Sequence, residues 1–201
     1  MNFLERKFAT RPRILNVLHA LSIAGPLSQT YPEELALLST YAAGAGIAVE
    51  IGSFQGVSSA LIAAAMRDDG ILYCVDPWPE RNGRSEPNLA IFRRHIRRRG
   101  LGGKIAILRG TSRVMAERLP RAVDFLFIDG DHSKAAIEFD WLLARDIVRA
   151  GGHVCLHDAL VPASEPWRTL GSAACFGEVI ARDPDFALVD SRHTMAVMRR
   201  R

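Results

Sequence analysis

The sequence predicts an α/β fold, a doubly wound sheet of seven mostly parallel strands with a C-terminal antiparallel hairpin. Short apolar runs alternate with amphipathic helical segments along most of the chain, as in parallel sheets covered on both faces. Glycine or proline interrupts most junctions between these segments. The last two apolar runs, Phe186–Asp190 and Met195–Met198, have no helix between them, so they should pair antiparallel.

Composition limits the class of protein. The chain has 201 residues, of which 48% are hydrophobic and 24% charged, typical of one globular domain. None of its three cysteines stands in a C-x-x-C pair, which favours reduced cysteines in a cytoplasmic protein. No apolar run is long enough to cross a bilayer. The net charge of +4 comes without a nucleic-acid motif, so we expect neither membrane nor nucleic acid as partner.

Two regions are expected, a helical lead-in over residues 1–30 and a main domain over residues 31–201. In the lead-in, Ile14, Leu15, Leu18 and Leu21 share one helical face, which is compatible with a homodimer. The helices expected in the main domain are Pro32–Ala43, Ser58–Met66, Leu89–Arg99, Ser112–Leu119, Ser133–Arg149 and Trp167–Arg182. The parallel strands expected there are Ile47–Ile51, Ile71–Asp76, Lys104–Arg109, Val123–Ile128 and His153–Leu156.

The first strand ends in a glycine turn that leads into a helix. Gly52 and Gly56 let a ligand approach the backbone, and the helix start offers unpaired N–H groups to an anion. Glu50 would repel a pyrophosphate but attract an amino group, which indicates a ligand carrying both an amine and a carboxylate. Phe54 replaces the second glycine of the dinucleotide fingerprint and therefore disfavours an NAD-dependent oxidoreductase. A purely structural turn is the alternative.

Ligands of such sheets bind at the carboxyl ends of the strands, so the residues after the next strands matter. Asp76 lies 24 residues after Gly52, close to the roughly 20 residues typical of nucleoside-binding sheets, and could accept both hydroxyls of a ribose. Its alternative role is to cap the turn before Pro77. Thr111 and Ser112 could line an adenine or simply cap the following short helix.

Carboxylates and imidazoles gather after the fourth and fifth strands. Asp129, Asp131 and His132 follow one strand, and His157 and Asp158 follow the other. Buried carboxylates are costly unless they are paired or bound to metal. Asp129 and Asp158 are the best candidate ligands for a divalent cation, with His157 as a third, although imidazole favours Mn²⁺ or Zn²⁺ over Mg²⁺. The alternative is that His157 and Asp158 cap a loop.

Together these segments resemble class I S-adenosylmethionine-dependent methyltransferases with the Rossmann-like methyltransferase fold. The most similar are small O-methyltransferases related to the catechol and caffeoyl-CoA enzymes and to the macrocin and mycinamicin sugar methyltransferases. The stretches that carry the resemblance are Val49–Ser58 (VEIGSFQGVS), Cys74–Trp78 (CVDPW), Asp124–Ser133 (DFLFIDGDHS) and Gly151–Asp158 (GGHVCLHD).

The resemblance implies a donor site and a base. The residues it assigns to S-adenosyl-L-methionine are Glu50, Gly52, Ser53, Gly56, Ser58, Asp76, Trp78, Thr111, Ser112 and Asp129. It implies that Asp129 also binds a divalent metal, Mg²⁺ or Mn²⁺, together with Asp158, and that His132 removes the proton of the acceptor. His157 stands where metal-dependent relatives carry an acidic residue, so its place as third ligand is a departure from the family pattern.

The implied reaction is methyl transfer to a hydroxyl of a small-molecule acceptor. Trp78, Trp167 and the loop at residues 159–166 are expected to border the acceptor pocket. Two other functions stay open. One is a metal-assisted hydroxylase or hydrolase on the same fold, because cephalosporin hydroxylases share the D-x-D-H-S stretch. The other is a catalytically silent protein that binds the donor.

Overall fold

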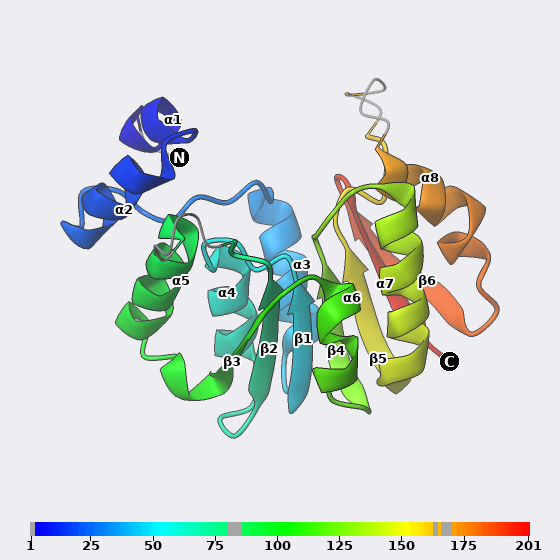
Figure 1. Cartoon of the computed structure of the whole chain (residues 1–201). Helices are drawn as coiled ribbons and strands as arrows, with labels where there is room; N and C mark the ends of the chain where they lie inside the picture. Colours follow the sequence, from blue (N-terminus) through cyan, green and yellow to red (C-terminus); the bar gives the residue numbers. More distant parts are fainter. Residues whose placement is uncertain (1–2, 80–85, 163–164, 166–169) are drawn as a thin grey trace.

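The computed structural model describes residues 3–79, 86–162, 165 and 170–201, and it contains the predicted sheet (Figure 1). The seven strands lie in the order β3-β2-β1-β4-β5-β7-β6. The strands are β1 (Ile47–Ile51), β2 (Ile71–Asp76), β3 (Ile105–Arg109), β4 (Val123–Ile128), β5 (Val148–Leu156), β6 (Phe186–Arg192) and β7 (Met195–Arg200). β7 runs antiparallel to both β5 and β6, which confirms the predicted hairpin.

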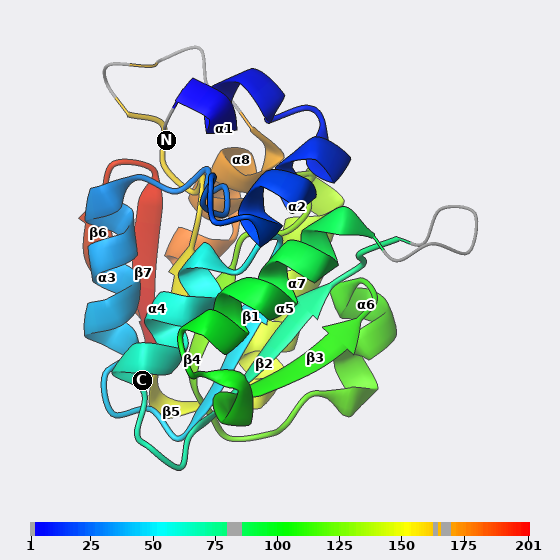
Figure 2. The same ribbon diagram turned by 90° about the vertical axis from the view of Figure 1, so that its left-hand side faces the viewer.

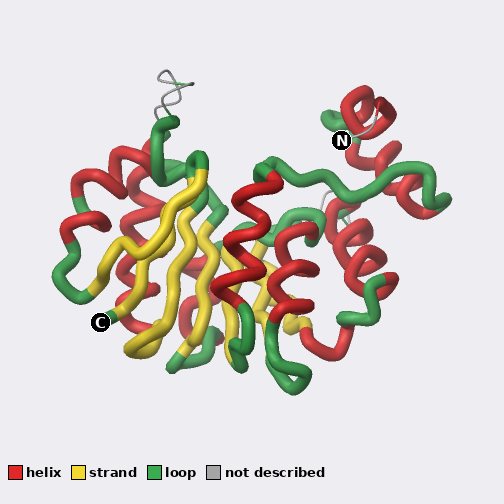
Figure 3. Tube along the Cα trace, turned by 180° about the vertical axis from the view of Figure 1, so that it is seen from behind, coloured by secondary structure: helices red, strands yellow, loops and turns green. Residues whose placement is uncertain are grey.

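Helices cover both faces of the sheet, because each buried strand has an apolar side chain on either face. In β4, Phe125 and Phe127 point to one core, whereas Leu126 and Ile128 point to the other. The helices on the first face are α3 (Pro32–Ala42), α4 (Val57–Ala65) and α5 (Pro87–Arg98). Those on the second are α6 (Ser112–Met115), α7 (Lys134–Ile147) and α8 (Gly171–Glu178) (Figure 1). Figure 3 shows the sheet, in yellow, from behind.

The lead-in forms α1 (Phe3–Phe8) and α2 (Pro12–Ala20), and α2 crosses α5 (Figure 2). Leu15 of α2 is buried against Ile91 and Leu27. Arg98 of α5 donates hydrogen bonds to the carbonyls of His19 and Ala20 at the end of α2. The lead-in is therefore docked on the domain. None of the described helices combines the length and apolarity needed to cross a membrane.

The structure corrects the junction between α7 and β5. The helix ends at Ile147 and the strand begins at Val148, so the predicted helix to Arg149 and strand from His153 were both wrong. The two glycines that were expected to separate them lie inside β5, where the register against β4 shifts. Gly151 has φ +78°, and a Cβ on Gly152 would lie 2.9 Å from the carbonyl oxygen of Val123. These glycines therefore permit a β-bulge in β5 and do not mark the end of a helix.

The last helix also differs from its prediction. α8 begins at Gly171, four residues after the expected start at Trp167. Trp167 and residues 163, 164 and 166 of the loop expected to border the acceptor pocket lie outside the described residues.

Candidate functional site

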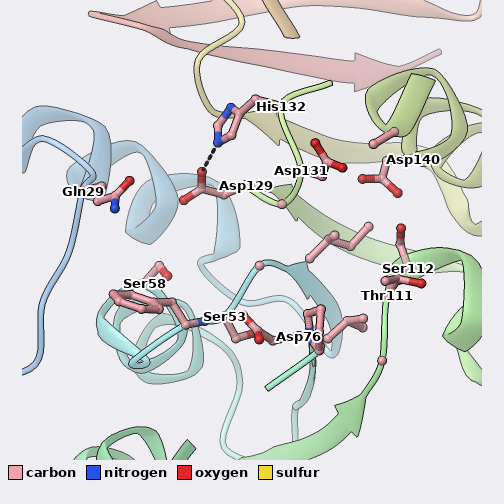
Figure 4. A pocket seen from close by; sticks show the side chains of 18 of the residues that line it. Gln29, Ser53, Ser58, Asp76, Thr111, Ser112, Asp129, Asp131, His132 and Asp140 are labelled. Carbon is pink, nitrogen blue, oxygen red and sulfur yellow. Dashed lines mark hydrogen bonds and ion pairs between the residues drawn. The ribbon is translucent and has the colours of Figure 1, made fainter. Parts of the chain in front are cut away.

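A cleft of about 720 Å³ opens at the carboxyl ends of β1 to β4 (Figure 4). The turns that follow four strands line it, together with residues 27–30 before α3 and part of α7. The predicted site residues in its wall are Gly52, Ser53, Gly56, Ser58, Asp76, Thr111, Ser112, Asp129 and His132. The predicted residues outside its wall are Glu50, Trp78, His157 and Asp158. Segments far apart in the chain thus share one cleft.

The turn after β1 depends on glycine at two places. Gly52 has φ +95°, and a Cβ there would lie 2.0 Å from the backbone oxygen of Asp129. Gly56, with φ +86°, is the residue before α4. These conformations bring the turn against the end of β4 and present the N-terminus of α4, with Ser58, to the cleft. A helix N-terminus favours a negatively charged group such as a carboxylate.

Glu50 lies beneath this turn and is fully buried. The hydroxyl of Ser59 donates a hydrogen bond to its Oε2, and the hydroxyls of Ser53 and Ser58 also interact with the carboxylate. Burial raises the pKa of Glu50, and these hydroxyls act in the opposite direction. The predicted contact between Glu50 and an amino group stays a prediction.

Asp76 connects the ends of β2 and β1. Its Oδ2 accepts a hydrogen bond from the amide of Phe54, and its Oδ1 accepts one from the amide of Trp78, both at 2.9 Å. Burial raises the pKa of Asp76, and the two amides lower it. Each carboxylate oxygen has a second lone pair. A carboxylate fixed in this way can still accept two neighbouring hydroxyls.

Trp78 has a structural position. Its indole nitrogen donates a hydrogen bond to the carbonyl of Phe54 at 2.8 Å, and its buried ring packs on Phe92. The side chain thus stabilises the Asp76 turn from behind, and it does not line the cleft described above.

His157 is the centre of a buried charge network. Its Nδ1 lies 3.0 Å from Oδ1 of Asp129, and its Nε2 lies 3.3 Å from Oε2 of Glu34. Burial lowers the pKa of His157, but its interactions with Asp129, Glu34 and Asp158 prevail and raise it to about 10. His157 is therefore an imidazolium at neutral pH, which offsets the charges of the carboxylates around it.

Glu34 is a site residue that the sequence does not reveal. It lies in the first turn of α3, where an acidic residue is ordinarily explained by the helix dipole. The structure buries it fully, and Thr194, 160 residues away, donates to it from both its amide and its hydroxyl. Burial raises the pKa of Glu34, but its ion pair with His157 and the hydrogen bonds from Thr194 and from the amide of Tyr31 lower it to about 2.

His132 stands at the edge of the cleft between two carboxylates (Figure 4). Its Nε2 lies 3.8 Å from Oδ1 of Asp129, and its Nδ1 lies 3.5 Å from Oδ2 of Asp158. The side chain is partly exposed. The imidazole is therefore positioned where a molecule in the cleft can reach it.

Three ligand atoms from Asp129, His132 and His157 lie within 4.8 Å of one another and form a candidate metal group. This group differs from the predicted trio, because His132 takes the place of Asp158. Asp158 instead approaches the Nδ1 atoms of the two imidazoles, at 3.5 and 3.6 Å. One carboxylate with two imidazoles suits Zn²⁺ or Mn²⁺ better than Mg²⁺.

The fold and the cleft define a doubly wound α/β protein with a cleft at the carboxyl ends of its parallel strands, where ligands of such sheets bind. Comparison with known proteins specifies the family. Residues 49–159 match the family model described as "Methyltransferase domain". The chain therefore belongs to the class I S-adenosylmethionine-dependent methyltransferases, as its motifs predict.

Curated relatives agree with this assignment. A Mycolicibacterium smegmatis protein named "Putative O-methyltransferase" is 30% identical over 171 residues, which are 83% of this chain and 70% of that protein. "Probable O-methyltransferase Rv1220c" of Mycobacterium tuberculosis is 29% identical over 140 residues, which are 68% of this chain but only 57% of that protein. These relatives are thus longer than the chain described here.

Solved structures share the fold. The O-methyltransferase TomG from Streptomyces achromogenes, in complex with SAM, has a TM-score of 0.69 at 16% identity and covers 99% of this chain and 96% of its own. An O-methyltransferase from Bacillus cereus, in complex with SAH, has a TM-score of 0.66 at 19% identity and covers 94% and 89%. At these identities the likeness shows a common fold.

Proposed function

We propose that this protein transfers the methyl group of S-adenosyl-L-methionine to a hydroxyl of a small-molecule acceptor. The observation that carries the proposal is one cleft that has Asp76, held by two backbone amides, at one end and the pair His132 and Asp129 at the other. The O-methyltransferase names of the relatives support the same chemistry.

Each chemical group of the donor can be matched to residues at the cleft. Asp76 accepts the ribose hydroxyls, and the N-terminus of α4 with Ser58 receives the carboxylate of the methionine part. The amino group lies toward Glu50 and Ser53, at the same end of the turn after β1. Adenine lies beside Thr111 and Ser112.

The chemical step is an in-line displacement. The acceptor oxygen forms a bond to the methyl carbon, the bond from this carbon to sulfur breaks, and S-adenosylhomocysteine leaves with both electrons on sulfur. His132 takes the proton of the acceptor hydroxyl, because its imidazole stands in the cleft wall and has a ring nitrogen that can accept a proton. Alignment of the two substrates in the cleft supplies a large share of the acceleration.

A divalent ion is compatible with the same end of the cleft, because Asp129, His132 and His157 converge there. Such an ion, when bound, polarises the acceptor hydroxyl. His157 already brings a positive charge to this end of the cleft. An ion that binds its ring nitrogen would therefore have to displace the proton there. Asp129 holds its position in either case, because His157 and His132 flank it.

Isothermal titration calorimetry with S-adenosylhomocysteine tests the donor site. The wild-type protein should bind in the micromolar range. Asp76→Ala should weaken binding by about 10- to 100-fold, as expected when hydrogen bonds to a charged group are lost. Asp69→Ala, on an exposed turn remote from the cleft, is the matched control and should bind as the wild type does.

Failure of the wild-type protein to bind would contradict the proposal and would favour a hydroxylase or hydrolase on this fold. Tight binding without turnover of any hydroxyl acceptor would favour a silent donor-binding protein.

A further inference from the structure

A buried carboxylate in the cleft has no role in the chemistry described so far. Asp140 lies on α7, is only 1% exposed, and lies in the cleft wall near Thr111 and Ser112 (Figure 4). The motifs of the sequence assign nothing to it, because it follows them inside a helix with ordinary amphipathic spacing.

The hydrogen bonding of Asp140 is incomplete. The hydroxyl of Ser112 interacts with its carboxylate, but Oδ1 has no hydrogen-bond partner among the described residues. Burial raises the pKa of Asp140 to about 6, with a further rise from Asp131 and an opposing effect of Arg113. A buried carboxylate oxygen without a hydrogen-bond partner is costly, which indicates that a ligand supplies the donor.

The chain keeps space open beside this carboxylate. Gly130, also in the cleft wall, faces it, and even a Cβ there would lie 4.0 Å from Oδ2 and 3.1 Å from Cγ2 of Ile51. Arg113 stacks on the ring of Phe139, with its guanidinium carbon 4.1 Å from the ring centre. Arg113, the positively charged side chain that lowers the pKa of Asp140, is therefore engaged with an aromatic ring.

We propose that Asp140 accepts a hydrogen bond from the exocyclic amino group of the donor's adenine, so that the cleft selects an aminopurine over an oxopurine. This inference rests on the proposed function, which places adenine beside Thr111 and Ser112. An amino group brings two N–H donors and can satisfy Oδ1. An oxopurine brings a carbonyl oxygen to the same place, and two acceptors then face each other without a proton between them.

The test compares S-adenosylhomocysteine with S-inosylhomocysteine, which differs only by an oxygen in place of the amino group. Calorimetry on the wild-type protein should show about 10- to 100-fold tighter binding of the adenosyl compound, the range expected for a hydrogen bond to a charged group. Asp140→Asn should reduce or invert this ratio, because a carboxamide can donate to the oxo group. Ser58→Ala, at the other end of the cleft, should weaken both compounds equally and leave the ratio unchanged.

The outcomes separate the two proposals. If the wild-type protein binds neither compound, the proposed function fails. If it binds S-adenosylhomocysteine but accepts S-inosylhomocysteine equally well, the inference is overturned without any variant. An unchanged ratio in folded Asp140→Asn also overturns it, because a merely structural role of Asp140 would affect both compounds alike.

Discussion

His132 and His157 are the same residue type beside the same carboxylate, yet their surroundings give them different chemistry. His157 is buried between Asp129 and Glu34, and its raised pKa keeps it positively charged. His132 lies at the edge of the cleft, partly exposed and farther from Asp129. A fixed charge stabilises a network, whereas an imidazole that gains and loses a proton can serve as a base. Of these two residues, His132 is the one that lies in the wall of the cleft, where a bound molecule can reach its imidazole.

The role of His132 leads to a kinetic prediction. His132→Ala should lower kcat by about 10²- to 10⁴-fold, the usual contribution of a general base. The affinity for S-adenosylhomocysteine should change little, because the donor contacts lie elsewhere in the cleft. Stopped assays of methyl transfer and calorimetry on the same protein measure the two quantities. An equal loss of turnover and of donor affinity would refute the base assignment.

His95, which lies outside the cleft, makes the free energy of unfolding depend on pH. It lies on α5, buried between Arg98 and Arg99 of its own helix and His19 of α2. Burial, and then these positive neighbours, lowers its pKa from 6.5 to about 4. As the pH falls from about 6.5 to about 4, His95 binds a proton in the unfolded chain but stays neutral in the folded protein. The free energy of unfolding therefore falls in this window.

Denaturant titrations can isolate this effect. Between pH 7.5 and pH 5, the free energy of unfolding of the wild type should fall by about 1 to 2 kcal/mol more than that of His95→Gln, at roughly 1.4 kcal/mol per pH unit below 6.5. Glutamine keeps a polar side chain but does not titrate. If the free energies of unfolding of the two proteins change equally with pH, His95 does not contribute to the pH dependence of stability.

At the scale of elements, α2 is connected to the cleft through the segment that follows it. Leu27 packs with Leu15 of α2 and Ile91 of α5, and its amide donates a hydrogen bond to Oε1 of Gln55 at 2.7 Å. Gln55 belongs to the turn after β1. Docking of α2 therefore supports one wall of the donor cleft, although the helix itself lies beyond the sheet (Figure 2).

Leu15→Ala tests this connection. Truncation of a buried leucine should lower the free energy of unfolding by about 2 to 4 kcal/mol. It should also weaken binding of S-adenosylhomocysteine, because the wall at residues 27–30 loses its support. Leu21→Ala removes the same atoms from a position that is 64% exposed, so it should change stability by less than about 0.5 kcal/mol. Similar losses in both variants would argue against a docked α2.

At the scale of the whole molecule, the sheet and the convergence of its strand ends were predictable, because alternating patterns and turn residues are local signals. The network of Glu34, His157 and Thr194 was not, because it joins α3 to β5 and β7 through contacts that leave no local pattern. The bulge in β5 escaped prediction for a related reason. Glycines after a helical segment ordinarily indicate the end of the helix. Only the pairing of β5 with β4 shows that Gly151 and Gly152 belong to a strand.

The position of β7 between β5 and β6 has a consequence for synthesis. Ribosomes deliver β6 before β7, yet β6 has no neighbour in the described sheet other than β7. This edge therefore cannot be assembled in the order of translation. During synthesis, β5 therefore has an open edge until β7 has emerged and can pair with it.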